Sequence, residues 1–223
     1  MALRGHVCAD ILVAQQPWPF QSNPPKLQGS LNSNNQNHDD NNYLNAMNAL
    51  REFGHWIYNH TATEQSDLIL ILTGDDLCLD HHHPRTTNTS KQYESCSYSS
   101  VKGQSVVGGA CRHRDHRQHR ALNLAIVEDY GLKMDGLHTM AHELGHLLGA
   151  VHDGEWPLAT IGGPGGANCR DGSPLIMSRD HPNNHQQLQT EWSKCTLEQF
   201  QHFFSTPQSI CLFNEPTNKQ IIS

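Results

Sequence analysis

The sequence predicts an α/β (α+β) fold, in which a mixed, mostly parallel sheet and its helices form an upper lobe above a smaller, irregular lower lobe. Three features predict this. Residues 68–72 are an apolar run typical of a buried strand, residues 43–58 carry apolar side chains at helical spacing, and Gly149 ends a second helical segment. The chain has 223 residues, 36% of them hydrophobic, which suits one domain over 1–223. We expect the upper lobe at about 1–150 and the lower lobe at about 151–216.

The other elements follow from local patterns. The segment 104–110 is short and contains glycine, which favours an edge strand, and the proline- and asparagine-rich stretch that includes 21–42 predicts a flexible loop. Strands are expected at 7–13, 68–72, 104–110 and 122–128, and helices at 43–58, 136–148 and 196–204. Asp135 is the expected N-cap of the second helix, and Thr196 with Gln199 forms a capping box for the last one.

Composition excludes several classes of partner. The chain has 22 acidic and 15 basic residues and a formal charge of −7, which argues against nucleic acid or an anionic membrane as the main partner. Its longest apolar run is too short to span a bilayer.

Cysteine usage indicates an extracellular protein. The seven cysteines are spread through the chain without a Cys-x-x-Cys pair, which favours disulfides. Asn59 and Asn88 begin glycosylation sequons, which also fit a secreted protein. The N-terminus is not a convincing signal peptide because Asp10 interrupts its apolar stretch, so either the signal was removed or the chain is a fragment.

The 17 histidines include one group whose spacing predicts a catalytic zinc site. His142 and His146 share one face of a helix, and Glu143 lies beside them. Gly149 lets the chain turn so that His152 can be the third zinc ligand, which leaves a fourth position open for water. Zinc lowers the pKa of that water, and Glu143 is expected to take its proton during attack on a carbonyl.

A histidine-rich chain produces such patterns by chance more often than average. The composition gives roughly 0.05 chance matches to the short His-Glu-x-x-His pattern, but on the order of 0.0003 once Gly149 and His152 are also required. A buried helix with incidental histidines is therefore the weaker interpretation.

With these residues in place, the sequence resembles the metzincin zinc endopeptidases, and Asp153 after the third histidine is the mark of their adamalysin or reprolysin branch. The pattern is similar to secreted reprolysins of arthropod saliva and venom. The segments that carry the resemblance are 107–111, 125–129, 173–178 and 211–216. It implies the metzincin fold, a zinc cleft between the lobes, and a Met-turn at Met177 beneath the metal.

The resemblance also implies further site residues. A peptide substrate would bind along Val107, Gly108 and Gly109, with Ser178 at the pocket wall. Disulfides would join Cys111 to Cys211 and Cys169 to Cys195, with Cys78 and Cys96 as a third pair that leaves out Cys8. A calcium ion would bind Asp76 and Asn214, although no counterpart of the family's first-strand glutamate is found. The family's first strand and helix are also not found in 1–42, which leaves open that the upper lobe is truncated at its N-terminal side.

The function expected is a secreted zinc endopeptidase, a monomer acting on extracellular proteins or peptides. One alternative is a catalytically inactive binding or decoy protein of the same fold. Another is a histidine-rich metal buffer that uses residues 81–83 or the histidines of 113–119. Residues 111–120 also hold four of the nine arginines, which favours a solvated loop or an exosite for an acidic partner over a metal site.

Overall fold

The structure is a computed structural model that describes residues 9–14, 43–59, 66–80, 96–97, 101–130, 136–170, 175–179 and 190–213. Several sequence predictions lie outside these residues: Cys8, the loop 21–42, the histidines 81–83, Asn88, Asp135 and Asn214. No helix within the described residues is long and apolar enough to cross a membrane.

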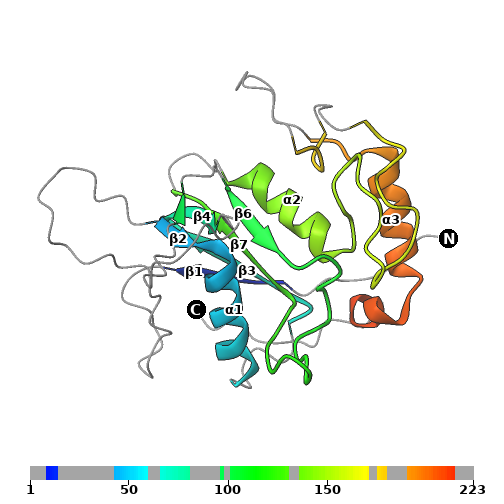
Figure 1. Cartoon of the computed structure of the whole chain (residues 1–223). Coiled ribbons are helices and arrows are strands. Elements are labelled where there is room, and N and C mark those ends of the chain that lie inside the picture. The colour runs from blue at the N-terminus through cyan, green and yellow to red at the C-terminus, as the bar shows by residue number, and fades with distance from the viewer. Residues whose placement is uncertain are drawn as a thin grey trace, which may run out of the picture.

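The main sheet has four strands in the order β1-β3-β7-β6 (Figure 1). Strands β1 (Ala9–Ala14), β3 (Leu68–Thr73) and β7 (Leu124–Glu128) are parallel, and β6 (Gly103–Ser105) pairs antiparallel with β7 at the edge. The expected mixed, mostly parallel sheet is therefore confirmed.

Two helices cover opposite faces of this sheet. Helix α1 (Ala46–Tyr58) packs on a face that includes Ile69 and Ile126, whereas α2 (Leu137–Leu147) packs on a face that includes Leu70 and Val127. Because neighbouring strand residues point to opposite faces, β3 and β7 are apolar up to their last residues, Thr73 and Glu128, as expected for strands buried on both sides. Figure 1 shows α2 above the strands and α1 below them.

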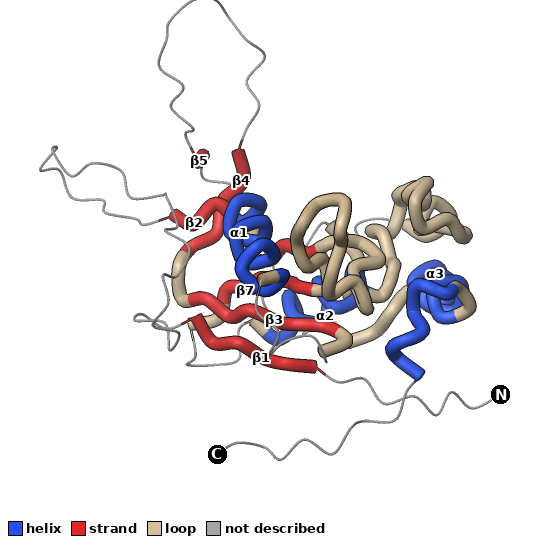
Figure 2. The backbone as a smooth tube through the Cα atoms, turned by 90° about the horizontal axis from the view of Figure 1, so that it is seen from below, coloured by secondary structure: helices blue, strands red, loops and turns tan. Residues whose placement is uncertain are grey.

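A second, small sheet was not expected from the sequence. It has the order β2-β4-β5 and lies beside α1 (Figure 2). Its strands are β2 (Tyr43–Asn45), β4 (Asp76–Asp80) and β5 (Cys96–Ser97). The prediction of a helix from residue 43 was therefore wrong at its start. The side chain of Asn45 accepts a hydrogen bond from the Asn48 amide at 2.8 Å and caps the helix there.

Three other boundaries also differ from the predictions. The edge strand ends at Ser105 instead of 110, because the amides of Gly108 and Ala110 donate to carbonyls of α2. The strand expected from 122 begins at Leu124. Helix α3 (Lys194–Phe204) begins before Thr196, because Ser193 is its N-cap and accepts the Thr196 amide at 3.0 Å.

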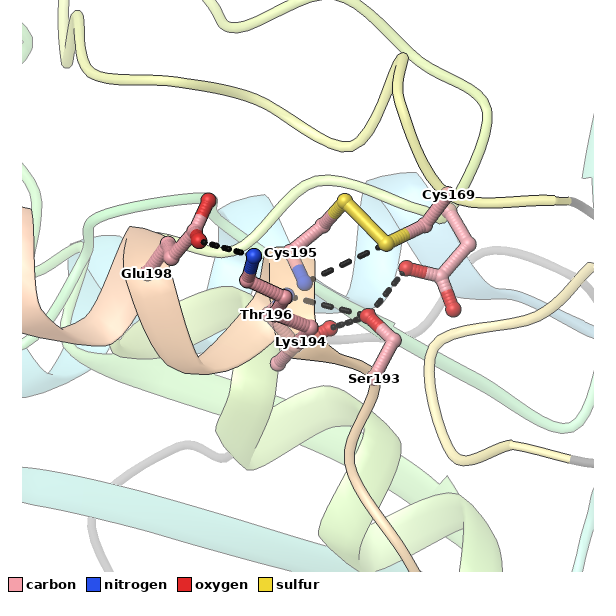
Figure 3. Close-up of a disulfide and its surroundings, with 7 residues drawn as sticks. Cys169, Ser193, Lys194, Cys195, Thr196 and Glu198 are labelled. Atoms are coloured by element: carbon pink, nitrogen blue, oxygen red, sulfur yellow. Dashed lines mark hydrogen bonds and ion pairs between the residues drawn. A yellow bond between two sulfur atoms is a disulfide. The ribbon is translucent and has the colours of Figure 1, made fainter.

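The segments after α2 fold mainly as loops against α3, which is followed by a 3₁₀ helix at Pro207–Phe213. Disulfides join Cys111 to Cys211 and Cys169 to Cys195, as the family resemblance implies. Cys78 is also disulfide-bonded, whereas the side chain of Cys96 lies outside the described residues. The Cys169–Cys195 bond ties the loop after the third histidine to the first turn of α3 (Figure 3).

Candidate metal centre and active site

Helix α2 and the turn after it bring the three histidines of the motif together. His142 and His146 lie one helical turn apart, and Gly149 adopts φ +92°, the left-handed conformation that ends the helix. Gly149 also contacts α3 closely, since a Cβ there would lie 2.8 Å from Cδ2 of Phe203. The chain then returns so that His152 faces the other two.

The three rings surround one point. The ring centroids are 4.8 Å apart for His142 and His146, 5.1 Å for His142 and His152, and 4.7 Å for His146 and His152. Their ligand atoms all lie within 4.8 Å of one another. Within the described residues, this is the group of His, Cys, Asp or Glu side chains that could hold a metal ion.

Each histidine ring is oriented by an oxygen atom that lies within 3.2 Å of its Nδ1 nitrogen. Nδ1 of His142 donates to the carbonyl of Ile176 at 2.6 Å, and Nδ1 of His146 donates to the carbonyl of Ala150 at 2.8 Å. Nδ1 of His152 lies 3.2 Å from Oε2 of Glu155. A neutral ring that donates from Nδ1 keeps its lone pair on Nε2, which is the atom directed inward.

This geometry fits a metal ion. Nε2 of His142 and Nε2 of His152 lie 3.2 Å apart, close enough for one cation to bind both nitrogens. Burial, reinforced by the neighbouring histidines, lowers the pKa of His142 to about 3 and that of His146 to about 4. Both rings are therefore neutral near pH 7, the state that binds metal, and a three-nitrogen donor set suits zinc.

Glu143 is buried beside this centre. The hydroxyl of Ser105 on β6 donates to Oε2 of Glu143 at 2.5 Å and lies 3.2 Å from the Glu143 carbonyl oxygen. Burial raises the pKa of Glu143 to about 7, against the opposing effect of the Ser105 hydrogen bond. The carboxyl group is thus fixed in place and can exchange a proton near neutral pH.

Met177 lies beneath α2 and is fully buried. A Cβ on Gly145 would lie 2.6 Å from Sδ of Met177, so the missing side chain lets the sulfur approach the helix between the two histidines. The Ser178 amide donates to the Leu175 carbonyl at 3.1 Å, which closes a tight turn around Met177. The Met177 carbonyl accepts the amide of Asp153 at 2.9 Å, and the turn is thereby joined to the third histidine's segment.

The side chain of Asp153 connects this segment to α3. It is fully buried, and Oδ1 accepts the hydroxyl of Ser193 at 2.6 Å. Ser193 is also the N-cap of α3 and lies next to the Cys169–Cys195 disulfide, as Figure 3 shows. One hydroxyl therefore joins the histidine segment to the start of α3.

The residues predicted for substrate and calcium have other partners. The Gly108 amide donates to the His146 carbonyl at 2.8 Å, and the Gly109 amide donates to Val106 at 2.9 Å, so neither is directed at a peptide. Ser178 is fully buried. The hydroxyl of Tyr130 donates to Asp76, while Asn214 lies outside the described residues.

Sequence reasoning missed three residues that contact a histidine of the centre or Glu143: Gly103, Ser105 and Glu155. Gly103 leaves room for Glu143, because a Cβ there would lie 2.8 Å from its Cγ. Arg179 pairs with Glu155 at 3.2 Å. A glutamate three residues after His152 and an arginine two residues after Met177 were visible in the sequence, but only the fold brings them together.

Comparisons with known proteins show the family. Residues 44–216 match the family described as "Reprolysin (M12B) family zinc metalloprotease". A Bombyx mori protein described as "A disintegrin and metalloproteinase with thrombospondin motifs like" is 33% identical over 175 residues, or 78% of this chain and 23% of that protein.

Two further relatives show the same relationship. "A disintegrin and metalloproteinase with thrombospondin motifs 18" of Mus musculus is 31% identical over 153 residues, or 69% of this chain and 10% of that protein. "Venom metalloproteinase antarease-like TtrivMP_A" of Tityus trivittatus is 35% identical over 97 residues, or 42% of this chain and 23% of that protein. The chain thus spans less than a quarter of the length of each of these relatives.

Proposed function

Because the chain belongs to the reprolysin (M12B) family of zinc metalloproteases, we propose that it is a secreted endopeptidase that hydrolyses peptide bonds in extracellular proteins. The observation that carries this proposal is the convergence of three histidines beside a buried glutamate. His142, His146 and His152 would hold the zinc ion. Zinc bound there supplies a Lewis acid that polarises the scissile carbonyl and activates water.

Glu143 acts as general base and then as general acid. Its Oε2 accepts the Ser105 hydroxyl, so Oε1 is the atom assigned to take the proton of the attacking water. The same oxygen then delivers this proton to the nitrogen of the leaving amine. A pKa near 7 suits both transfers, because the proton is held and released with similar ease at neutral pH.

An extended substrate would add a strand to β6, which is the outer strand of the main sheet beside Glu143. We assign to the cleft wall the residues Val107, Gly108 and Gly109. They would shape the wall without binding the peptide backbone, since the Gly108 and Gly109 amides already donate to acceptors within the chain. Ser178 supports the pocket from beneath, next to Met177, the proposed Met-turn residue.

Activity is tested with a quenched peptide whose two ends are blocked, so that only cleavage within the chain gives a signal. Zinc-loaded protein is expected to cleave it, and a hydroxamate inhibitor or removal of zinc is expected to stop the reaction. Stoichiometric zinc without turnover would favour a catalytically inactive binding protein. Several weakly bound ions per chain would favour a metal buffer.

The proposed enzyme is extracellular and carries glycans and a calcium ion. The disulfides and the similarity to a venom metalloproteinase support an extracellular protein. We assign it as a monomer that is glycosylated at Asn59 and Asn88. The exposed Asn59 ends α1, where its side chain donates to the His55 carbonyl at 2.9 Å. Calcium binding by Asp76 and Asn214 rests on the family resemblance. It predicts that calcium raises the thermal midpoint of the wild type but not of Asp76→Asn.

A further inference from the structure

Residues 111–120, named here the basic loop, carry a charge opposite to the rest of the chain. They contain four of the nine arginines and one acidic residue, a net charge of 4 − 1 = +3 with histidines counted neutral. The remaining residues therefore sum to −7 − 3 = −10. A local cationic surface on an acidic protein attracts an anionic partner to one place.

The basic loop is held in a defined shape. A disulfide fixes Cys111, the Leu122 amide donates to the Arg112 carbonyl at 2.8 Å, and Asp115 and Arg120 form an isolated β-bridge. The loop's one carboxylate is turned inward. Asp115 Oδ1 accepts the amides of Arg117 and Gln118 at 3.1 and 2.9 Å, and Oδ2 pairs with Arg112 at 2.5 Å.

Helix α1 supports the same loop. Arg114 lies over the Tyr58 ring, 5.7 Å from its centroid, and the Tyr58 hydroxyl is hydrogen-bonded to Nδ1 of His116 at 3.0 Å. Nδ1 of His55 donates to the carbonyl of His119 at 2.9 Å. His119 adopts φ +51°, which is uncommon for a residue with a side chain, so this contact holds the backbone in a strained turn.

These contacts hold exposed arginine side chains on an ordered base. Arg114 and Arg117 are exposed, and Arg120 is oriented by a 2.8 Å hydrogen bond from its Nε to Gln118. A guanidinium binds two oxygens of a sulfate group at once. We propose that the basic loop is an exosite for a sulfated polysaccharide.

Two other polyanions fit the surface less well. The side chains of 111–120 offer no large apolar group to insert into a lipid surface. The Tyr58 ring already contacts Arg114, His116 and His119 and is not available for stacking on nucleic acid bases. A flexible polysaccharide with repeated sulfate groups can bind the arginines of the basic loop without an apolar insertion or a stacking surface.

The exosite is separate from the metal centre. The basic loop packs at the C-terminal end of α1, below the sheet in Figure 1, whereas α2 with His142 lies above it. A bound polysaccharide would therefore hold the protein in place without covering the histidines. Its binding can be measured without any cleavage.

The test measures binding of the zinc-loaded full chain to heparin over a series of salt concentrations. Arg114→Gln with Arg117→Gln is compared with Arg170→Gln with Lys194→Gln, which removes the same charge from exposed positions elsewhere. The loop variant is expected to bind at least about tenfold more weakly. The slope of log affinity against log salt should become about 1–2 smaller in magnitude, while the control keeps the wild-type slope.

A third variant, Arg114→Lys with Arg117→Lys, should keep the salt slope but lose affinity, because lysine retains the charge without the bidentate contact. Zinc content and near-ultraviolet circular dichroism show that each variant is folded. The proposal is overturned if wild-type protein does not bind heparin at physiological salt, or if both charge-removing variants weaken equally. Equal binding to desulfated heparin, polyglutamate or phosphatidylserine vesicles would also overturn it.

Discussion

Oε2 of Glu155 lies 3.2 Å from Nδ1 of His152, whereas the other two histidines are oriented by backbone carbonyls. The second oxygen of Glu155 lies 3.2 Å from Nη1 of Arg179, two residues after Met177. Among the three proposed zinc ligands, His152 is thus the one whose orientation depends on a side chain. A point mutation can remove this contact without altering the helix.

The first prediction concerns Glu155→Gln. The amide is a weaker acceptor than the carboxylate, so the ring of His152 is held less firmly and zinc affinity should fall about 10–100-fold. Competition with a chromogenic chelator measures this affinity. Glu198→Gln is the control, because Glu198 forms an exposed pair with Lys194 at 3.6 Å. Equal zinc affinity in the two variants would show that Glu155 does not orient the ligand.

The second prediction concerns Gly103→Ala. The added Cβ would lie 2.7 Å from Thr139 Cγ2 and 2.8 Å from Glu143 Oε1, so the carboxylate must shift. Displacing a catalytic group by about an ångström lowers kcat on the order of 100-fold, while zinc content stays unchanged. Gly74→Ala is the matched control, since a Cβ there has nothing within 4 Å. Wild-type kcat in Gly103→Ala would contradict the assigned geometry.

The third prediction concerns Ser193→Ala. This change removes the N-cap of α3 and the hydrogen bond to buried Asp153 together. The free energy of unfolding should fall by about 2–3 kcal/mol, measured by urea denaturation with the disulfides intact. Ser205→Ala removes an exposed hydrogen bond to the His202 carbonyl and should cost less than about 0.5 kcal/mol. If the two variants were equally stable, Ser193 would not connect these segments.

The fourth prediction concerns acid stability of the zinc-free protein. From about pH 6.5 down to 4.5, the unfolded chain binds protons at His142 and His146 that the folded protein excludes. Over the same range the folded protein holds a proton on Glu143 that the unfolded chain releases. The unfolded state therefore binds about one proton more, and stability should fall by about 1.4 kcal/mol per pH unit of acidification.

Urea denaturation in the presence of a chelator measures this slope. Glu143→Gln removes the opposing proton, so its slope between pH 6.5 and 4.5 should be about twice that of the wild type. Zinc-free wild-type protein that becomes more stable on acidification in this range would contradict neutral, buried histidines.

The sequence was sufficient for the elements with strong local signals. Residues 68–72 are apolar because both faces of β3 are covered, and Gly149 marks the end of α2 because it requires a positive φ. Elements that depend on distant partners were not predictable. Strand β2 forms because Tyr43–Asn45 pairs with Asp76, Leu77 and Cys78, which no local pattern indicates.

The same distinction holds for the site. His142 and His146 are one helical turn apart and Glu143 directly follows His142, so their proximity follows from local geometry. Ser105 contacts Glu143 only because β6 lies at the edge beside α2, and the two residues are 38 apart in sequence. Helix α3 was predicted to start at Thr196 because Thr196 and Gln199 form a capping box in the sequence. Ser193 offers the same capping chemistry three residues earlier, and it is the N-cap in the structure, where it also contacts the distant Asp153.

The central claim is that Glu143 moves the proton during peptide hydrolysis at the three-histidine centre. The most direct test compares kcat of zinc-loaded wild type and Glu143→Gln on the end-blocked quenched peptide, with zinc per chain measured in the same samples. One zinc per chain in both proteins, and a kcat at least about 100-fold lower in the variant, is the result we predict. Equal kcat at equal zinc occupancy, or a zinc-loaded wild type that does not cleave the peptide, would contradict the claim.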